Sequence, residues 1–294
     1  MNKNYAYIIL AAIFWGTMGI FVNYLSDLGL STVQIAMLRS LVSFLFMTLL
    51  ILCKDRKLFR IHLRDVWMFL GTGIASYFLF NNCYFIAIKE VGVAVSSVLL
   101  YTSPIFVTLM SCIFFHEKLT KRKVLCLILA VGGCALVSGL ASGNVGEVST
   151  GGILIGLASG FCYALYSIFS TYALRKYQVI TVTFYTFLFG AAAALLIGDP
   201  VDTFRIIANP TGILWALALG IISGAVPYFL YTLGLSRVDP SHAAVIATAE
   251  PVVASLIGIF FFRESADVFT VMGIVLIIGA AVMLNLHAKV INQL

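Results

Sequence analysis

Ten apolar runs, each close to twenty residues long, dominate this chain of 294 residues. A helix needs about 20 apolar residues to cross the hydrocarbon core of a membrane, so each run predicts one membrane-spanning helix. The expected spans are 5–25, 33–53, 66–87, 93–114, 124–141, 151–173, 180–198, 211–235, 241–262 and 268–287. The sequence therefore predicts an all-α integral membrane protein with ten transmembrane helices.

The composition excludes other classes of protein. Hydrophobic residues make up 62% of the chain and charged residues only 10%, against about 25% charged residues in a soluble domain. A disordered chain needs the opposite balance. The net charge of +6 comes from short basic clusters between the apolar runs, so no basic face is available for nucleic acid.

The positions of the basic residues predict the orientation. Of the 18 Lys and Arg residues, only Lys89, Arg205 and Arg263 fall in loops on the side opposite the N-terminus, and Arg39 falls within a run. Because cytoplasmic loops are the ones enriched in Lys and Arg, we expect both termini in the cytoplasm of a protein of the cell membrane.

An internal repeat predicts the architecture. A shift of the sequence by 147 residues places Pro104 on Pro251 and Glu117 on Glu264. Each half then holds five helices, and an odd number makes the second half enter the membrane from the other side. Such inverted-topology repeats are typical of secondary transporters. The expected division is a first repeat over 1–140, a linker over 141–150 and a second repeat over 151–290.

Glu250 lies near the middle of the ninth run and is the strongest candidate for function. An acidic side chain there costs about 2.5–3.5 kcal/mol on insertion scales, which is tolerated where it faces a cavity or a partner. Glu250 is therefore a site for a proton or a cationic substrate group, or a hydrogen-bonded structural residue. His242 precedes it by two helical turns and is a second candidate for proton coupling, with a capping role or a contact to the neighbouring loop as the alternative.

Ser103-Pro104 and Glu250-Pro251 occupy matching places in the two halves. A proline inside a helix removes one hydrogen bond, so both sites predict helix breaks. Paired breaks at corresponding positions point to a central binding site, although a packing kink would leave the same pattern.

Polar and aromatic side chains recur at helical spacing inside the runs, which predicts an amphipathic cavity. Arg39 either binds a substrate carboxylate through its two-pronged guanidinium or extends to the membrane surface. The expected substrate-binding residues are Trp15, Arg39, Tyr77, Asn81, Tyr84, Tyr101, Tyr163, Tyr228 and Glu250.

Enzyme and cofactor signatures are missing from the sequence. The six cysteines form no CxxC or Cys/His cluster, so no metal site is expected. The P-loop pattern and the hydrolase motifs GxSxG and HExxH do not occur, so neither ATP-driven transport by this chain nor intramembrane catalysis is expected, and no cofactor is predicted.

Several motifs together resemble the drug/metabolite transporter superfamily, and most closely its ten-helix EamA type. They are FWG at 14–16, Arg39, TSP at 102–104 with HEKL at 116–119, and EPVVAS at 250–255 with RE at 263–264. The resemblance implies export of small metabolites, often amino acids, or of drugs, through a cavity lined by the first, third, fourth, sixth, eighth and ninth helices. Small four-helix relatives carry an essential Glu in their first helix, where this chain has Trp15 and Gly16.

The sequence therefore predicts a secondary transporter, in the direction of export, for small amphipathic or zwitterionic compounds by alternating access. The alternatives are a lipid or metabolite flippase and a facilitative, channel-like permease. The expected partners are a small-molecule substrate, membrane lipid and protons as a candidate coupling ion, and the expected assembly is a monomer or a weak dimer.

Overall fold

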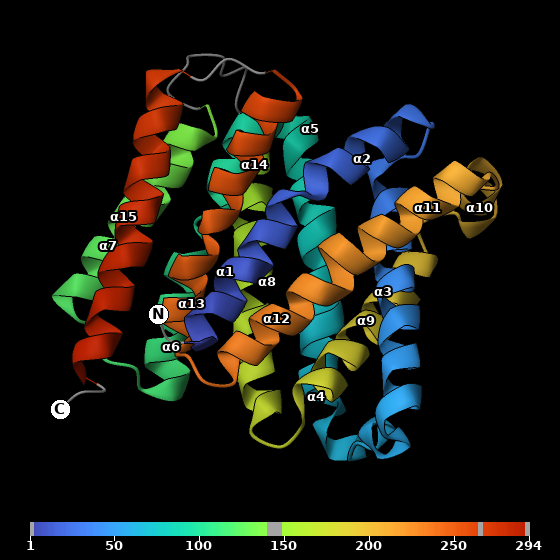
Figure 1. The fold of residues 1–294 in the computed structure, drawn as a ribbon, viewed down its shortest axis with the longest axis horizontal. Coiled ribbons are helices and arrows are strands. Elements are labelled where there is room, and N and C mark those ends of the chain that lie inside the picture. The colour runs from blue at the N-terminus through green and yellow to red at the C-terminus, as the bar shows by residue number, and fades with distance from the viewer. Residues whose placement is uncertain (1–2, 140–148, 264–266, 292–294) are drawn as a thin grey trace.

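The computed structural model describes residues 3–139, 149–263 and 267–291, and the regular elements in these ranges are all helices (Figure 1). The α-helices are α1 (Lys3–Gly16), α2 (Met18–Asp27), α3 (Thr32–Lys54), α4 (Val66–Leu70), α5 (Leu79–Leu100), α6 (Ser103–Phe115), α7 (Lys121–Val137), α8 (Thr150–Leu174), α9 (Val179–Leu195), α10 (Pro200–Ile206), α11 (Pro210–Ala218), α12 (Val226–Leu235), α13 (Pro240–Ala247), α14 (Ala249–Phe261) and α15 (Val268–Ile291). The predicted linker, except for residues 149 and 150, and Glu264 lie outside the described residues.

Six helical stretches in this part of the chain are long and apolar enough to cross a membrane, and a bent pair makes a seventh. They cover 3–27, 32–54, 63–100, 150–174, 210–235 and 240–261, and the pair joins α9 to α10 at an angle of 98°. Within 63–100, Gly92 has a φ of +78° and interrupts the helix between the third and fourth predicted runs. The all-helical membrane class is confirmed, whereas ten spans and the orientation remain predictions.

Two of the stretches are broken near their middles, and a third break follows the end of the stretch 63–100. Thr17 separates α1 from α2, Tyr101 and Thr102 separate α5 from α6, and Thr248 separates α13 from α14. Pro104 occupies the first turn of α6 and Pro251 the first turn of α14, so the breaks lie two or three residues before the prolines. A proline fits the first turn of a helix because the N–H it lacks would have no partner there.

Two further segments depart from α-helical geometry at corresponding places in the two halves. η3 (Gly71–Phe78) leads into α5, and η5 (Leu219–Ala225) leads into α12; both are π-helices. Short π-helical turns inside α-helices are frequent at functional sites. Both segments lie beside the buried centre of the molecule, where Tyr77 of η3 is only 2% exposed.

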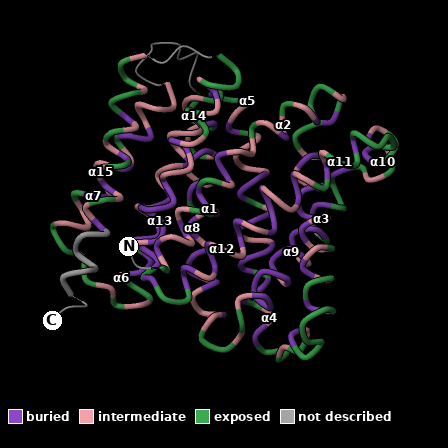
Figure 2. Tube along the Cα trace, viewed as in Figure 1, coloured by how far each residue is buried: buried purple, intermediate pink, exposed green. Residues whose placement is uncertain are grey.

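Close contacts at glycines hold neighbouring helices together. A Cβ atom on Gly160 of α8 would lie 2.7 Å from the Leu99 carbonyl oxygen, and one on Gly133 of α7 would lie 2.8 Å from the Gly273 carbonyl oxygen of α15. Small residues permit this approach of two backbones. The pair α7 and α15 forms one edge of the molecule, and the buried residues concentrate on the inner helices (Figures 1 and 2).

Candidate functional site

An aromatic cage lies at the centre of the molecule, formed by Trp15, Tyr163, Tyr166, Tyr228 and Tyr231. The Trp15 ring centroid is 5.2 Å from that of Tyr228, 5.4 Å from that of Tyr231 and 6.5 Å from that of Tyr163. With Ser167, these side chains surround a space of ≈ 10 Å³. That space is about the minimum for one water molecule, so the cage is closed.

Neighbouring hydroxyl groups satisfy two of the cage tyrosines. The Tyr166 and Thr232 hydroxyls are 2.6 Å apart, and the Ser167 and Tyr231 hydroxyls are 2.8 Å apart. Both pairs join α8 to α12. A buried phenol needs such a partner, because an unpaired polar group loses its hydrogen bonds to water without compensation.

The local sequence around Trp15 allows α1 to carry its ring into this space. A Cβ atom on the next residue, Gly16, would lie 2.6 Å from Val253 Cβ and 2.9 Å from the Glu250 carbonyl oxygen. Only glycine permits this contact between α1 and α14. The FWG sequence therefore supplies a cage residue and, directly after it, the close approach to the helix that bears Glu250.

Arg39 of α3 is 5% exposed and binds neutral groups alone in the described part of the chain. Its Nε donates to the Tyr77 hydroxyl at 3.0 Å, its Nη1 to the Met18 thioether at 2.6 Å, and its Nη2 to the Asn81 amide oxygen at 3.5 Å. A thioether and a distant amide are weak acceptors for a guanidinium. Arg39 is thus a buried cation with capacity for a stronger, anionic partner.

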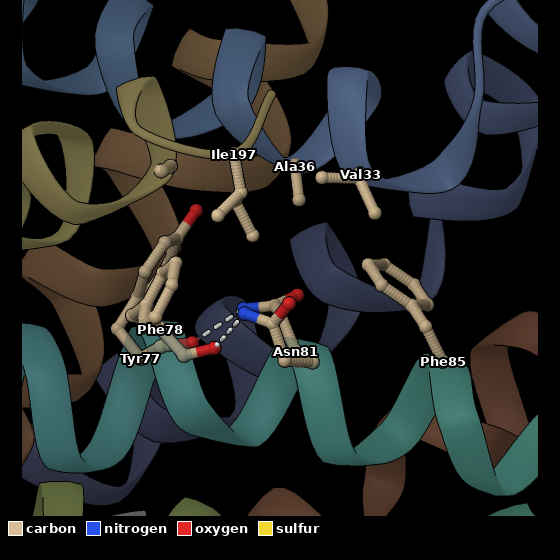
Figure 3. Close-up of a pocket in the computed structure, with 9 residues that line it drawn as sticks. Val33, Ala36, Tyr77, Phe78, Asn81, Phe85 and Ile197 are labelled. Carbon is tan, nitrogen blue, oxygen red and sulfur yellow. Dashed lines mark hydrogen bonds between the residues drawn. The ribbon is translucent and has the colours of Figure 1, made fainter. Parts of the chain in front are cut away.

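A small hollow opens beside this arginine, between η3 with α5 and the start of α3. Figure 3 shows Tyr77, Asn81 and Phe85 directed toward Val33 and Ala36 of α3. The Asn81 amide nitrogen donates to the Tyr77 carbonyl at 2.6 Å, which turns the Asn81 amide oxygen toward Arg39. The hollow also measures ≈ 10 Å³, so it is as tightly filled as the cage.

Glu250 lies in the first turn of α14. Its carboxyl group is within hydrogen-bonding range of the Tyr163 hydroxyl and within electrostatic range of Arg39. Tyr84 and Tyr101 also interact electrostatically with it. The N-terminal end of a helix favours a negative charge, so the Thr248 break provides a suitable place for this acid.

The structure thus brings the predicted binding residues to one region. Tyr77 and Tyr228 have ring centroids 5.5 Å apart, and the Phe80 ring links Tyr163, at 5.1 Å, to Tyr84, at 6.0 Å. The Tyr84 hydroxyl contacts the Ser97 hydroxyl at 2.9 Å. The role of these residues in substrate binding stays a prediction.

His242 pairs with Asp239, whereas the sequence suggested proton coupling between His242 and Glu250. Its Nδ1 lies 3.4 Å from an Asp239 carboxylate oxygen, one turn earlier, at the start of α13. The hydrogen bond from His242 lowers the pKa of the Asp239 carboxyl. This contact matches the alternative of a histidine that binds the loop before its helix, and no described contact joins it to Glu250.

Several contacts at the site could not be predicted from sequence alone. Met18 is an apolar residue in an apolar run, and nothing in the pattern pairs it with Arg39. Tyr166 and Tyr231, in contrast, share helix faces with the predicted residues Tyr163 and Tyr228, and this helical spacing marks them in the sequence. Metal-binding clusters of three or more His, Cys, Asp or Glu residues are absent from the described ranges.

Comparisons with known proteins identify the family of this chain. The model of a family described as "EamA-like transporter family" matches residues 2–139 and 150–286. An uncharacterized transporter of Archaeoglobus fulgidus is 30% identical over 277 residues, which cover 93% of each chain. The uncharacterized transporter YwfM of Bacillus subtilis is 27% identical over 272 residues, covering 92% of this chain and 89% of the relative.

Two more matches extend over nearly the whole chain. The uncharacterized inner membrane transporter YicL of Salmonella typhimurium is 20% identical over 294 residues, covering 98% of this chain and 97% of the relative. A solved structure, described only as "Crystal structure of protein", superposes with a TM-score of 0.82 at 18% identity and covers 99% of both chains. At that identity the superposition establishes the fold alone.

Proposed function

The chain belongs to the EamA-like transporter family, and from that premise we propose that it exports a small zwitterionic metabolite by alternating access through its central aromatic cage. The family resemblance inferred from the sequence motifs is confirmed. The chain is accordingly a transporter and not an enzyme, and it is a multi-pass protein of the cell membrane. The substrate class, the direction and the mechanism are the proposal.

The observation that carries the proposal is the buried charge of Arg39. A charged side chain at this depth is costly unless it has a partner, and its present partners Tyr77, Met18 and Asn81 are neutral. A carboxylate would accept two parallel N–H bonds from the guanidinium, which is the strongest arrangement available to arginine. We therefore place the substrate carboxylate at Arg39.

Glu250 supplies the complementary end of the site. Its carboxyl and the Arg39 guanidinium are within electrostatic range and form no ion pair with each other. A substrate ammonium group there would contact Glu250 and the faces of Trp15, Tyr163 and Tyr228, which attract cations. A zwitterion satisfies both charges at once.

Features that recur in the two halves support alternating access. The π-helices η3 and η5 correspond, as do the helix breaks at Tyr101 and Thr248. The family matches over 2–139 and 150–286 favour two repeats over 1–140 and 151–290, joined by the linker 141–150. Inverted repeats of ten spans with both termini in the cytoplasm would let the halves rock around the cage.

Coupling to protons is part of the proposal. Glu250 is the proposed proton carrier because its carboxyl group interacts with Tyr163 of the cage and with Arg39. His242 remains a second candidate for proton coupling, and it lies beside Asp239 at the start of α13. Export is proposed from the family resemblance. It is tested by imposing a proton gradient in either direction across vesicles in which the protein has one orientation.

The test is counterflow in proteoliposomes, after a thermal-shift screen of metabolites has selected a ligand. Arg39→Lys keeps the charge but removes the two-pronged donor. We expect the apparent affinity for a carboxylate ligand to fall by about 10- to 100-fold, the range of a lost charged hydrogen bond. The amide derivative of the same ligand should bind both proteins equally.

Arg175→Lys is the matched control, since Arg175 also stacks on aromatic rings, at 5.2 Å from Phe115 and 5.1 Å from Tyr172, away from the cage. It should leave counterflow unchanged. Equal affinity of wild-type protein and Arg39→Lys for the carboxylate ligand would disprove the assignment of the carboxylate to Arg39.

A further inference from the structure

A basic loop, residues 54–65, joins α3 to α4 at the end of the molecule opposite α2 and α10 (Figure 1). Its five cationic side chains are all exposed, and none of them takes part in an ion pair in the described part of the chain. They are Lys54, Arg56, Lys57, Arg60 and Arg64. The loop connects two apolar stretches, so it lies at a membrane surface.

The two acidic residues of the loop do not neutralise these cations. The Asp65 carboxylate is buried, where it accepts hydrogen bonds from Lys176 Nζ at 2.7 Å and from the Tyr177 hydroxyl at 2.7 Å. The Asp55 carboxylate accepts from the Lys57 backbone N–H at 2.8 Å and caps η1 (Arg56–Phe59). The loop therefore carries an excess of positive charge.

The backbone of the loop is fixed against the second half of the chain. Thr181 donates to the Leu58 carbonyl at 2.9 Å, Tyr185 donates to the Phe59 carbonyl at 2.7 Å, and the His62 N–H donates to Tyr177 at 3.0 Å. Because these bonds hold the loop in one conformation, the cations are presented at defined positions. A ligand then loses less conformational freedom when it binds.

An open hollow of ≈ 540 Å³ lies on this loop, lined by both polar and apolar side chains. Arg64 and Lys176 form its charged side, and Leu63, which is 89% exposed, forms its apolar side. Trp67, 47% exposed, follows at the start of α4. Tryptophan is enriched at the boundary between lipid headgroups and acyl chains.

We propose that the basic loop binds the phosphate headgroup of an anionic phospholipid, held by Arg64 at the hollow and by the exposed Arg60 of the same loop, with Leu63 and Trp67 against its acyl chains. Basic clusters next to a membrane span attract anionic lipid, and arginine suits phosphate because its planar fork binds two oxygens. This site is separate from the aromatic cage, so the inference stands whatever the transporter carries.

The experiment measures thermal unfolding of the purified full chain in detergent, titrated with a short-chain phosphatidylglycerol. Phosphatidylcholine of the same chain length and inorganic phosphate are the comparison ligands. We expect phosphatidylglycerol to raise Tm by mass action, while phosphatidylcholine and phosphate leave Tm unchanged. The double variant Arg60→Gln/Arg64→Gln should bind phosphatidylglycerol about 30-fold more weakly.

Lys118→Gln/Lys121→Gln is the matched control. It removes two exposed cations from another basic segment and lowers the net charge equally. The control should keep the full lipid-induced shift in Tm. Equal loss in both double variants would overturn the proposal, because general charge attraction would then explain binding. A shift produced by phosphatidylcholine or by phosphate alone would overturn it as well.

Discussion

Arg39 and Tyr77 contact each other twice. The Arg39 Nε donates to the Tyr77 hydroxyl at 3.0 Å, and the guanidinium carbon lies 5.2 Å from the centroid of the same ring. Tyr77 belongs to the π-helix η3 and packs with its ring centroid 5.5 Å from that of Tyr228. A ligand that displaces Arg39 from Tyr77 therefore disturbs both the cage and an irregular helix.

The substitution Glu250→Gln tests proton coupling. Glutamine keeps the shape of the side chain but cannot bind and release a proton. A proton drives transport only if it binds the two conformations of the transporter with different affinities, and the variant has no such proton site at position 250. We expect the variant to fold and to exchange substrate in counterflow, while uptake driven by a pH gradient falls to background. Proteoliposome assays with and without the gradient measure both properties.

Glu90→Gln is the control for this experiment, because Glu90 is exposed and its carboxylate accepts a hydrogen bond from the Ser149 hydroxyl at 3.2 Å. Its gradient-driven uptake should equal that of the wild type. If Glu250→Gln also keeps wild-type gradient-driven uptake, Glu250 is a structural partner of the Thr248 break and not a proton carrier.

The fluorescence of Trp15 should report substrate in the cage. Trp15 contacts Tyr163, Tyr228 and Tyr231, and it is 6% exposed, so a ligand entering the cage must change its surroundings. We expect a saturable fluorescence change with wild-type protein that is lost in Trp15→Phe. Trp67→Phe should retain it, since Trp67 packs on Phe169 outside the cage. An undiminished signal in Trp15→Phe would place the substrate elsewhere.

Two adjacent glycines of α7 give a stability prediction with an internal control. A Cβ atom on Gly133 would lie 2.7 Å from Ile277 Cγ1 and 2.8 Å from the Gly273 carbonyl oxygen, whereas Gly132 has nothing within 4 Å. Gly133→Ala should therefore lower the free energy of unfolding of the protein by about 1–3 kcal/mol through overpacking. Gly132→Ala should leave the free energy of unfolding unchanged or raise it by up to about 1 kcal/mol, because alanine favours the helix more than glycine does.

Thermal unfolding in one detergent measures both variants side by side. Equal Tm values for the two would show that α7 and α15 do not approach each other at Gly133, and the packing of this edge would have to be revised.

The buried Asp65 should control the order of the basic loop. Asp65→Asn removes the charge that holds Lys176 and Tyr177, and Tyr177 in turn accepts the His62 N–H. We expect faster hydrogen exchange of the amides between residues 56 and 65. Asp55→Asn, at an exposed position of the same loop, should affect only the N-terminal end of η1. Unchanged exchange in Asp65→Asn would contradict this linkage.

The sequence predicts the helices well because their signal is local. Run lengths and breakers locate α3 and α8 to within a few residues, and the Pro104 and Pro251 positions predict breaks that the structure has two or three residues earlier. The π-helices η3 and η5 carry no such signature. A π-turn depends on how neighbouring helices pack, which residue spacing does not encode.

For the candidate site, the sequence identifies residue types better than partners. Glu250 and Arg39 stand out because charges are rare in apolar runs, and Trp15 stands out with its motif. The pairing of Arg39 with Met18, or of Asp65 with Lys176, links positions far apart in sequence, and residue spacing within one sequence does not encode such contacts.

The closed cage has a consequence for measured affinity. Because the rings around Trp15 leave only ≈ 10 Å³, a ligand can bind only the fraction of molecules in which they have separated. The observed dissociation constant then equals the intrinsic one divided by that fraction, so one open molecule in about a hundred weakens apparent binding about 100-fold. A substitution such as Thr232→Val, which unlinks Tyr166 without reaching the ligand, would raise the apparent affinity simply by making open molecules more common.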